Sequence, residues 1–207
     1  MLGVKKAMEF SNNWFDPHVS AWNAIIPTYK PQKILEIGSY EGRSVCHLIA
    51  LLGNERTLDI TCVDTWEGGA EHEGTDMFAV EQRFDRNVTA VVGGTKFPAK
   101  IRKLKSRTDV GLCGLIALGE EETYDLFYID GSHETPDVLS DGVLCFELLK
   151  ISGLMIFDDY LWGLGQNTKS LTSPKMGIDA FLNCFQGKMQ VHPWMLNYQL
   201  YCRRLTR

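Results

Sequence analysis

The sequence lacks the cysteine pairs of a structural zinc site and any apolar segment long enough to cross a bilayer. Its six cysteines form no CxxC pair, and no histidine lies at metal-ligand spacing from any of them. This pattern excludes a zinc framework. No segment approaches the roughly 20 apolar residues of a transmembrane helix, and no apolar run follows the amino-terminal lysines, so we expect neither a membrane span nor a signal peptide. Most cysteines lie in apolar segments, which is typical of buried free thiols and predicts a cytoplasmic protein.

Positive charge is also scarce. The chain has 21 Lys and Arg against 26 Asp and Glu, a net charge of -5. Such a surface repels nucleic acid and anionic membranes, so we expect neither as a partner and predict a small-molecule substrate. Residues 100–107 form a basic run, which we interpret as a charged edge strand that discourages pairing with other chains. Formation of a homo-oligomer stays open.

The 207 residues contain neither repeats nor low-complexity segments and suffice for one domain. Short apolar runs alternate with helical patterns, which indicates a parallel sheet covered by helices. The expected strands span 33–37, 58–63, 101–104, 124–129 and 154–157, followed by a hairpin of 189–192 and 198–203. The expected helices span 42–52, 77–92, 110–118 and 178–185. A further helix is expected to have Thr135 as its N-cap and Pro136 as its first residue, and to end near Gly153.

The ends of the first two predicted strands indicate an adenosine site. Residues 36–42 read EIGSYEG, where two glycines permit a tight turn and the following helix offers unpaired N–H groups. Asp64 ends the second strand and can accept the hydroxyls of a ribose. The turn lacks the middle glycine of GxGxxG, and Glu36 would repel a pyrophosphate but suits a sulfonium. This favours S-adenosylmethionine over NAD, although a nicotinamide-dependent oxidoreductase and a non-catalytic adenosine-binding module remain alternatives.

Three acidic residues follow the fourth and fifth strands. Asp130 ends the fourth, while Asp158 and Asp159 end the fifth. Adjacent parallel strands lie about 4.8 Å apart, so these carboxylates should converge at the carboxyl edge of the sheet. Because three carboxylates so close together repel, a hard cation such as Mg²⁺ or Mn²⁺ is expected between them. Alternatively, Asp130 caps the turn at Gly131 and one of the pair faces solvent.

His133 follows Asp130 on the same loop. With a reference pKa of about 6.5 it can act as a general base at neutral pH, and it can equally join the metal ligands or hold the loop. His72 and Lys175 are weaker candidates that fit an ordinary surface as well.

Five segments together resemble the class I S-adenosylmethionine-dependent methyltransferases, and within them methyltransferase family 24. They are LEIGSYEGRS at 35–44, VDTWEG at 63–68, YIDGSH at 128–133, FDDY at 157–160 and PKMGIDAFL at 174–182. The placement of the acids is also similar to that of the catechol O-methyltransferases, which carry a lysine base where this chain has His133.

The resemblance implies a fold and a set of site residues. The fold is α/β, a single doubly wound Rossmann-like sheet of seven strands, the last antiparallel, with helices on both faces. One domain would span 1–207, with 1–30 as an amino-terminal cap. The implied cofactor residues are Glu36, Gly38, Ser39, Gly42, Asp64, Trp66, Ser106 and Asp130. Trp66 would flank the adenine, although plain packing explains it as well.

The resemblance also implies O-methylation of a small hydroxylated molecule, with phenols among the candidate acceptors. His133 and Asp130 would be the catalytic residues, and Asp130, Asp158 and Asp159 the metal ligands. Residues 14–22 and 162–173 would form a substrate lid, whose aromatic side chains suggest a planar or apolar acceptor: Trp14, Phe15, Tyr160 and Trp162. A metal-free methyltransferase of the same fold is the nearest alternative.

Overall fold

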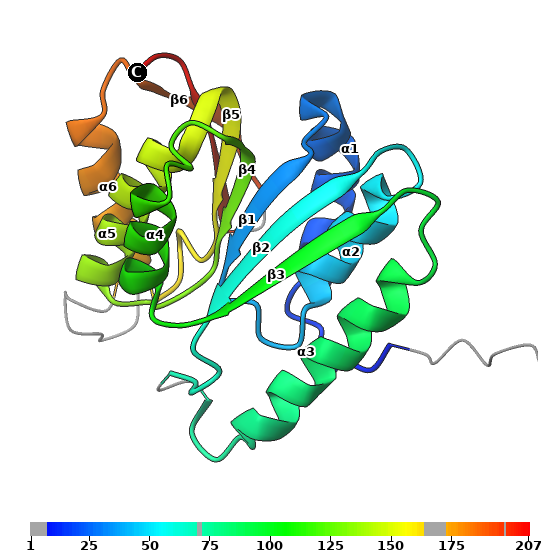
Figure 1. The fold of residues 1–207 in the computed structure, drawn as a ribbon. Coiled ribbons are helices and arrows are strands. Elements are labelled where there is room, and N and C mark those ends of the chain that lie inside the picture. Colours follow the sequence, from blue (N-terminus) through cyan, green and yellow to red (C-terminus); the bar gives the residue numbers. More distant parts are fainter. Residues whose placement is uncertain (1–7, 70–71, 164–172, 197) are drawn as a thin grey trace, which may run out of the picture.

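Seven strands form one twisted sheet in the computed structural model, which describes residues 8–69, 72–163, 173–196 and 198–207 (Figure 1). The strand order is β3-β2-β1-β4-β5-β7-β6. The strands are β1 (Lys33–Ile37), β2 (Leu58–Asp64), β3 (Ala99–Lys105), β4 (Tyr124–Ile129), β5 (Leu149–Phe157), β6 (Met189–Leu196) and β7 (Gln199–Arg204). The sheet begins in its middle at β1, and later strands are added first on the β2 and β3 side and then on the β4 and β5 side. The sheet is therefore doubly wound, as predicted.

The strand directions also agree with the prediction. Strands β1 to β5 pair in parallel, whereas β7 is antiparallel to both β5 and β6. The last two strands form the expected hairpin. Every parallel strand therefore ends at the same edge of the sheet, and the loops that follow β1, β2, β4 and β5 meet there.

Helices cover both faces of the sheet (Figure 1). They are the short 3-10 helix η1 (Asp16–His18) and the α-helices α1 (Val19–Tyr29), α2 (Arg43–Leu52), α3 (Met77–Val92), α4 (Thr108–Ala117), α5 (Thr135–Leu148) and α6 (Pro174–Cys184). Helices α1, α2 and α3 pack on one face, and α4, α5 and α6 pack on the other. The central strands β1, β2 and β4 are thus buried on both sides, which explains their near-continuous apolar runs in the sequence.

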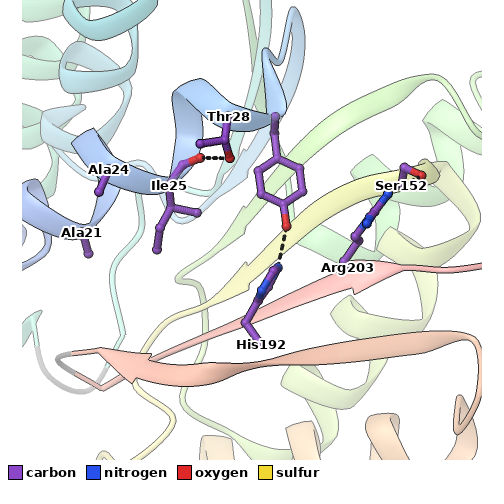
Figure 2. Close-up of a pocket in the computed structure, with 8 residues that line it drawn as sticks. Ala21, Ala24, Ile25, Thr28, Ser152, His192 and Arg203 are labelled. Atoms are coloured by element: carbon purple, nitrogen blue, oxygen red, sulfur yellow. Dashed lines mark hydrogen bonds between the residues drawn. The ribbon is translucent and has the colours of Figure 1, made fainter.

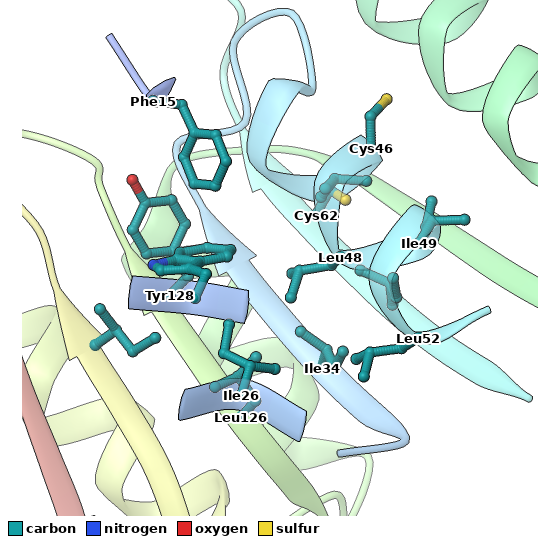
Figure 3. Packing of buried hydrophobic residues seen from close by; sticks show 14 of the residues in the cluster. Phe15, Ile26, Ile34, Cys46, Leu48, Ile49, Leu52, Cys62, Leu126 and Tyr128 are labelled. Atoms are coloured by element: carbon teal, nitrogen blue, oxygen red, sulfur yellow. The ribbon is translucent and has the colours of Figure 1, made fainter. Parts of the chain in front are cut away.

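Two hydrophobic clusters fill the space between the sheet and its helices. On the α1 to α3 face, Ile34 and Leu126 from the sheet pack with Ile26 and Leu52 from the helices (Figure 3). Side chains that point the other way along the same strands, such as Leu35, join the cluster under α4 to α6. The alternation along each strand divides one sheet between two cores.

The predicted boundary between the fifth helix and the fifth strand is wrong. Helix α5 ends at Leu148 rather than near Gly153, and β5 starts at Leu149, which pairs with Tyr124. The helix does not continue because Leu149 already has an extended backbone (φ -78°, ψ 132°). Ser152 further along has a left-handed backbone (φ 70°), and the β4–β5 register shifts in this part of the strand. Helix α6 also begins earlier than expected, at Pro174.

The predicted N-cap of α5 is also wrong. Helix α5 begins at Thr135 itself, and its N-cap is Glu134, which makes no side-chain cap hydrogen bond. The Thr135 hydroxyl instead donates to the backbone carbonyl of Ser173 at 2.9 Å. That bond joins the starts of α5 and α6, so a tertiary contact takes the place of the local one.

The basic run lies on β3, which is an edge strand as expected. Its side chains are paired within the protein, Arg102 with Glu120 and Lys103 with both Glu81 and Asp85. These ion pairs neutralise the basic side chains, so the run does not form a free basic patch. This agrees with the edge-strand interpretation.

The amino-terminal segment lies against the turn that follows β1. Ser11 donates its backbone N–H and its hydroxyl to the Glu41 carboxylate, at 2.6 and 2.8 Å, and Asn87 on α3 bonds to the backbone of Glu9. The assignment of 1–30 as a cap on a single domain stays a prediction, and residues 1–7 lie outside the described part of the chain. None of the described helices is long and apolar enough to cross a membrane.

Candidate cofactor and acid site

A large cavity opens where the parallel strands end. Its volume is about 1470 Å³, above the roughly 300–1,000 Å³ of a typical small-molecule site. It is lined by residues from five strand ends and from the amino-terminal segment, among them Gly38, Asp64, Ser106, Asp130, Asp158 and His18. The volume has room for a nucleoside cofactor together with a second molecule.

The turn after β1 needs both of its glycines. Gly38 and Gly42 have positive φ values of 75° and 76°. A Cβ on Gly38 would lie 1.8 Å from the backbone oxygen of Asp130, and one on Gly42 would lie 2.9 Å from the Phe84 ring. Glycine is therefore required for the turn to pack closely against the β4 loop, as the sequence predicted. Ser39, between them, lines the cavity.

Asp64 fixes that turn from the neighbouring strand. Its Oδ2 accepts the backbone N–H groups of Ser39 and Tyr40 at 2.8 and 2.9 Å, and its Oδ1 accepts that of Trp66 at 2.7 Å. A carboxylate offers about four lone-pair positions. Three are already used, so the Asp64 side chain can take one ribose hydroxyl rather than the two expected from the sequence.

Glu36 lies beneath the turn and has no solvent-exposed surface. The hydroxyls of Ser39 (2.6 Å) and Ser44 donate to its carboxylate. Burial raises the pKa of Glu36 to about 7, and the two serine hydrogen bonds oppose that rise. The two serines line the cavity and Glu36 does not, so the Glu36 carboxylate lies behind the cavity wall.

Trp66 is part of the hydrophobic core. Its exposure is 3%, its ring lies 5.0 Å from that of Phe84, and its Nε1 donates to the Tyr40 carbonyl at 2.9 Å. Lys103 covers the ring, with Nζ 4.5 Å from the centroid. Trp66 does not line the cavity. This position matches the packing alternative.

The acids after β4 and β5 converge, together with the histidine. One ligand atom each from Asp130, His133 and Asp159 lies within 4.8 Å of the others, a spacing that could hold a metal ion. His133 Nε2 and Asp159 Oδ2 are 2.9 Å apart. The sequence predicted Asp158 in this group, and the structure places His133 there instead. His133 thus lies in a group that could hold a metal ion and also contacts the β5 loop through Asp159.

Asp158 belongs to a buried hydrogen-bond network on the inner side of the acids. The Tyr128 hydroxyl contacts Oδ2 of Asp130 at 3.0 Å and also Oδ2 of Asp158. Gln199 Nε2 donates to Asp158 Oδ2 at 2.9 Å, while Trp22 donates to Gln199 Oε1 at 2.8 Å. Tyr128 has one hydrogen to give, so the two carboxylates need a further proton or a cation between them.

The electrostatics of the acids agree with that conclusion. Desolvation raises the pKa of Asp130 well above its usual range, and Asp158 and Asp159 raise it further. Desolvation also raises the pKa of Asp158, against the lowering effect of His18. Both shifts express the cost of holding like charges together away from water.

No sequence pattern singled out His18 as a site residue. It ends η1, is 8% exposed and lines the cavity, and its Nε2 lies 3.8 Å from Asp158 Oδ1. Its Nδ1 is buried and has no hydrogen-bond partner in the part of the chain that the structure describes. The available signal was a histidine in the segment expected to cap the site.

Aromatic side chains border the cavity at two places. Trp14 and Phe15 line it on the amino-terminal side, and Trp162 lines it beside His133, with 4.3 Å between the ring centroids. Tyr160 is bonded to Asp179 and does not line the cavity. Residues 164–172 of the expected lid lie outside the described residues.

The weaker candidates have local partners. Lys175 is paired with Asp179 four residues along α6. His72 stacks on Tyr40, with 5.0 Å between the ring centroids, and it lines the cavity.

A second hollow lies away from the strand ends, between α1 and the strands β5, β6 and β7. Its volume is about 640 Å³, and Ala21, Ala24 and Ile25 give it an apolar wall (Figure 2). At its polar end, Tyr29 is hydrogen-bonded to His192 at 2.5 Å. None of the predicted site residues lines this hollow.

The fold and the strand-end turn define a nucleoside-binding α/β protein. A family model described as a methyltransferase domain matches residues 35–160, more than half of the chain. The chain therefore belongs to methyltransferase family 24 and has an S-adenosylmethionine-dependent methyltransferase domain, which removes the nicotinamide-dependent alternative. No curated protein matches the sequence.

Solved structures share the fold at low sequence identity. The O-methyltransferase TomG from Streptomyces achromogenes, in complex with S-adenosylmethionine, is 14% identical with a TM-score of 0.65, and the match covers 98% of this chain and 83% of that one. An O-methyltransferase from Bacillus cereus with bound S-adenosylhomocysteine is 14% identical, with a TM-score of 0.63 and coverage of 97% and 84%. A Staphylococcus aureus protein assigned as a caffeoyl-CoA O-methyltransferase is 14% identical with a TM-score of 0.64, and the match covers 96% of this chain and 86% of that one.

Proposed function

We propose that the protein transfers a methyl group from S-adenosylmethionine to a hydroxyl oxygen of a small molecule, with the help of a divalent cation. The observation that carries the proposal is the group of Asp130, His133 and Asp159, whose ligand atoms lie within 4.8 Å of one another. This group lines the same cavity as the Gly38 turn. The methyl donor and the acceptor hydroxyl can therefore meet inside one enclosed space.

The cofactor is placed by the turn and by Asp64. The ribose lies at the remaining lone pair of Asp64, and the backbone N–H groups at the start of α2 face the methionine part. Ser39 and Ser44 present their hydroxyls to the cavity while they donate to Glu36. The buried negative charge behind them favours the cationic sulfonium over a pyrophosphate.

The residues present fit a hard cation. The carboxylates of Asp130 and Asp159 are oxygen ligands of the kind that Mg²⁺ and Mn²⁺ prefer, and in this proposal His133 beside them is the base rather than a ligand. The carboxylates of Asp130 and Asp158 share the single hydrogen of Tyr128. A positive ion beside Asp130 and Asp159 would relieve the repulsion among the three acids. When bound, such an ion supplies Lewis acidity, which lowers the pKa of the acceptor hydroxyl.

His133 takes the proton of the acceptor hydroxyl in this proposal. Its contact with Asp159 orients the imidazole, and the neighbouring carboxylate stabilises the imidazolium that forms. The methyl transfer itself is an in-line displacement, so the protein contributes mainly by aligning oxygen, carbon and sulfur. The Trp162 ring beside His133 and the apolar Phe15, which also lines the cavity, suit a planar acceptor.

A metal-free methyltransferase of the same fold is the second candidate. It is favoured by Asp158, which already has protein partners in Tyr128 and Gln199 and a histidine nearby. A buried carboxylate with such partners does not require a metal. The small-molecule acceptor, the cytoplasmic location and the open question of a homo-oligomer belong to the proposal as well; the four buried free thiols support the location.

The experiment measures Mn²⁺ binding by electron paramagnetic resonance together with methyl transfer to a panel of phenols and sugars. Asp130→Asn and Asp159→Asn should each weaken Mn²⁺ binding at least about tenfold, and chelation should abolish transfer while S-adenosylhomocysteine binding persists. Asp179→Asn, an acid outside the cavity, is the matched control. Transfer that is indifferent to chelation would support the metal-free enzyme.

A further inference from the structure

Asp141 is a buried carboxylate that no step of the proposed reaction uses. It lies in the second turn of α5, is 3% exposed and lines the large cavity. Within the described ranges of the chain, its side chain has no hydrogen-bond or ion-pair partner. Burial raises the pKa of Asp141 to about 7, and the nearby Asp137 and Asp109 add to the rise. A buried carboxylate is costly unless something supplies the missing hydrogen bond.

The hydroxyl of Ser106 is a hydrogen-bond donor at the same end of the cavity. It follows β3 and lines the cavity, and its Oγ is buried without a partner among the described residues. Glycines leave space beside both groups. A Cβ on Gly111 would lie 2.8 Å from Ser106 Oγ, and one on Gly131 would lie 3.6 Å from Asp141 Oδ2.

The two glycines sit above one position of the sheet. A Cβ on Gly131 would contact Ile37 at 2.9 Å, and one on Gly111 would contact Val63 at 3.0 Å. Ile37 and Val63 are directly paired on the adjacent strands β1 and β2. Ser106 and Asp141 therefore approach a common floor from the α4 side and the α5 side.

The proposed cofactor position puts a purine at this floor. With the ribose at Asp64 and the methyl group toward Asp130, the base extends toward α4 and α5. Adenine presents an amino donor at N6 beside an acceptor at N1. A carboxylate accepts from the first, and a serine hydroxyl donates to the second. The two groups lie at the same end of the cavity and match the edge of adenine in hydrogen-bonding sense.

We propose that Asp141 determines the base specificity of the cofactor site by accepting the 6-amino group of adenine, with Ser106 donating to N1. This inference rests on the proposed binding of S-adenosylmethionine in the cavity. A base with an oxygen at position 6 would turn that oxygen toward the carboxylate and leave both unpaired. Sites built to bond an N–H group discriminate strongly against analogues that lack it.

The test compares S-adenosylhomocysteine with S-inosylhomocysteine, which has an oxygen in place of the 6-amino group, by isothermal titration calorimetry at about pH 8.5. The unmodified protein should prefer the adenosyl ligand about 30-fold, the equivalent of about 2 kcal/mol. Asp141→Asn should reduce the preference to about threefold or less, because an amide can turn its NH₂ group toward the oxygen. Glu147→Gln, an exposed change of the same charge on the same helix and outside the cavity, should retain it.

Two further outcomes complete the test. If Asp141→Asn does not fold, the unmodified protein is titrated with the purine analogue that lacks the amino group, and a preference of at least about tenfold for adenine supports the inference. Equal binding of the adenine ligand and its analogues by the unmodified protein, or an undiminished preference in Asp141→Asn, overturns the proposed role of Asp141. Either result leaves the cofactor proposal standing. Failure of the unmodified protein to bind S-adenosylhomocysteine overturns the cofactor proposal and this inference with it.

Discussion

His18 Nε2 lies 3.8 Å from Asp158 Oδ1, although the two residues lie far apart in the sequence. His133 makes the equivalent contact with the next residue, Asp159, at 2.9 Å. Two histidines, one from the amino-terminal segment and one from the β4 loop, therefore face consecutive carboxylates at the end of β5. The amino-terminal segment is thus part of the wall of the acid site.

We expect His18→Ala to impair the acceptor half of the reaction. The buried Nδ1 of His18 has no partner among the described residues and its ring lines the cavity, so it is placed to bond to a bound acceptor. The variant should lower kcat/KM for the acceptor about tenfold, or ~1.4 kcal/mol. Its Kd for S-adenosylhomocysteine should stay within about twofold.

His18→Asn is the companion variant, because an amide keeps one hydrogen-bonding group at this place and should recover part of the rate. If both variants lose cofactor affinity in parallel with kcat/KM, His18 supports the fold rather than the acceptor.

Gly38→Ala should disrupt the cofactor turn. The added methyl group would lie 1.8 Å from the backbone oxygen of Asp130, and backbone atoms cannot yield as a flexible side chain can. We expect at least about 3 kcal/mol of destabilisation in urea and no measurable binding of S-adenosylhomocysteine. Gly119→Ala provides the control, since Gly119 has a similar φ of 76° but nothing within 4 Å of its Cβ position. Its cost should be the backbone strain alone, about 1 kcal/mol. Similar losses in both variants would show that φ, not the close approach, limits the turn.

Gln199→Leu should leave three polar groups without their hydrogen-bond partner at once. The Gln199 amide accepts from Trp22 and Tyr201, each at 2.8 Å, and donates to Asp158. Leucine keeps the approximate size but leaves buried donors and a carboxylate without partners, at about 1–3 kcal/mol for each group. The free energy of unfolding should fall by about 3 kcal/mol or more. Gln190→Leu on the exposed side of the same hairpin should change it by less than about 0.5 kcal/mol. A small effect at Gln199 would mean that water replaces the amide.

The sequence located the strand ends, and hence the edge where the site forms. A buried parallel strand is a short apolar run with an abrupt polar end, so Ile37, Asp64 and Ile129 were placed correctly before any tertiary contact was known. The order of such strands follows from the connection rules of doubly wound sheets. Site residues that stand directly on strand ends were therefore within reach of prediction.

The hydrogen-bond partners of those residues could not be predicted from the sequence. Asp158 is held by Gln199 and Tyr128, and the position of Gln199 depends on Trp22 donating to it from α1. These contacts join segments that are far apart in the sequence, and they exist only after α1 has packed against the sheet. Asp141 was missed for a similar reason. An acid inside an amphipathic helix looks exposed in sequence, and only the close approach of α5 to the β4 loop buries it.

Glu36 should make the folded protein more stable at acidic than at alkaline pH. The pKa of Glu36 is raised by burial from 4.5 to about 7, so the folded chain holds a proton that the unfolded chain releases first. As the pH rises from about 4.5 to about 7, the free energy of unfolding falls, and above that range the loss is complete. From the size of the shift, about 2 kcal/mol should disappear between about pH 5 and about pH 8. Glu36→Gln should remove this part of the slope, since glutamine can still bond to Ser39 and Ser44. Urea unfolding without cofactor at the two pH values measures the difference, with the exposed Glu147→Gln as control. An unchanged slope in Glu36→Gln would mean that Glu36 is already ionised in the folded protein, with a counter-charge at the turn.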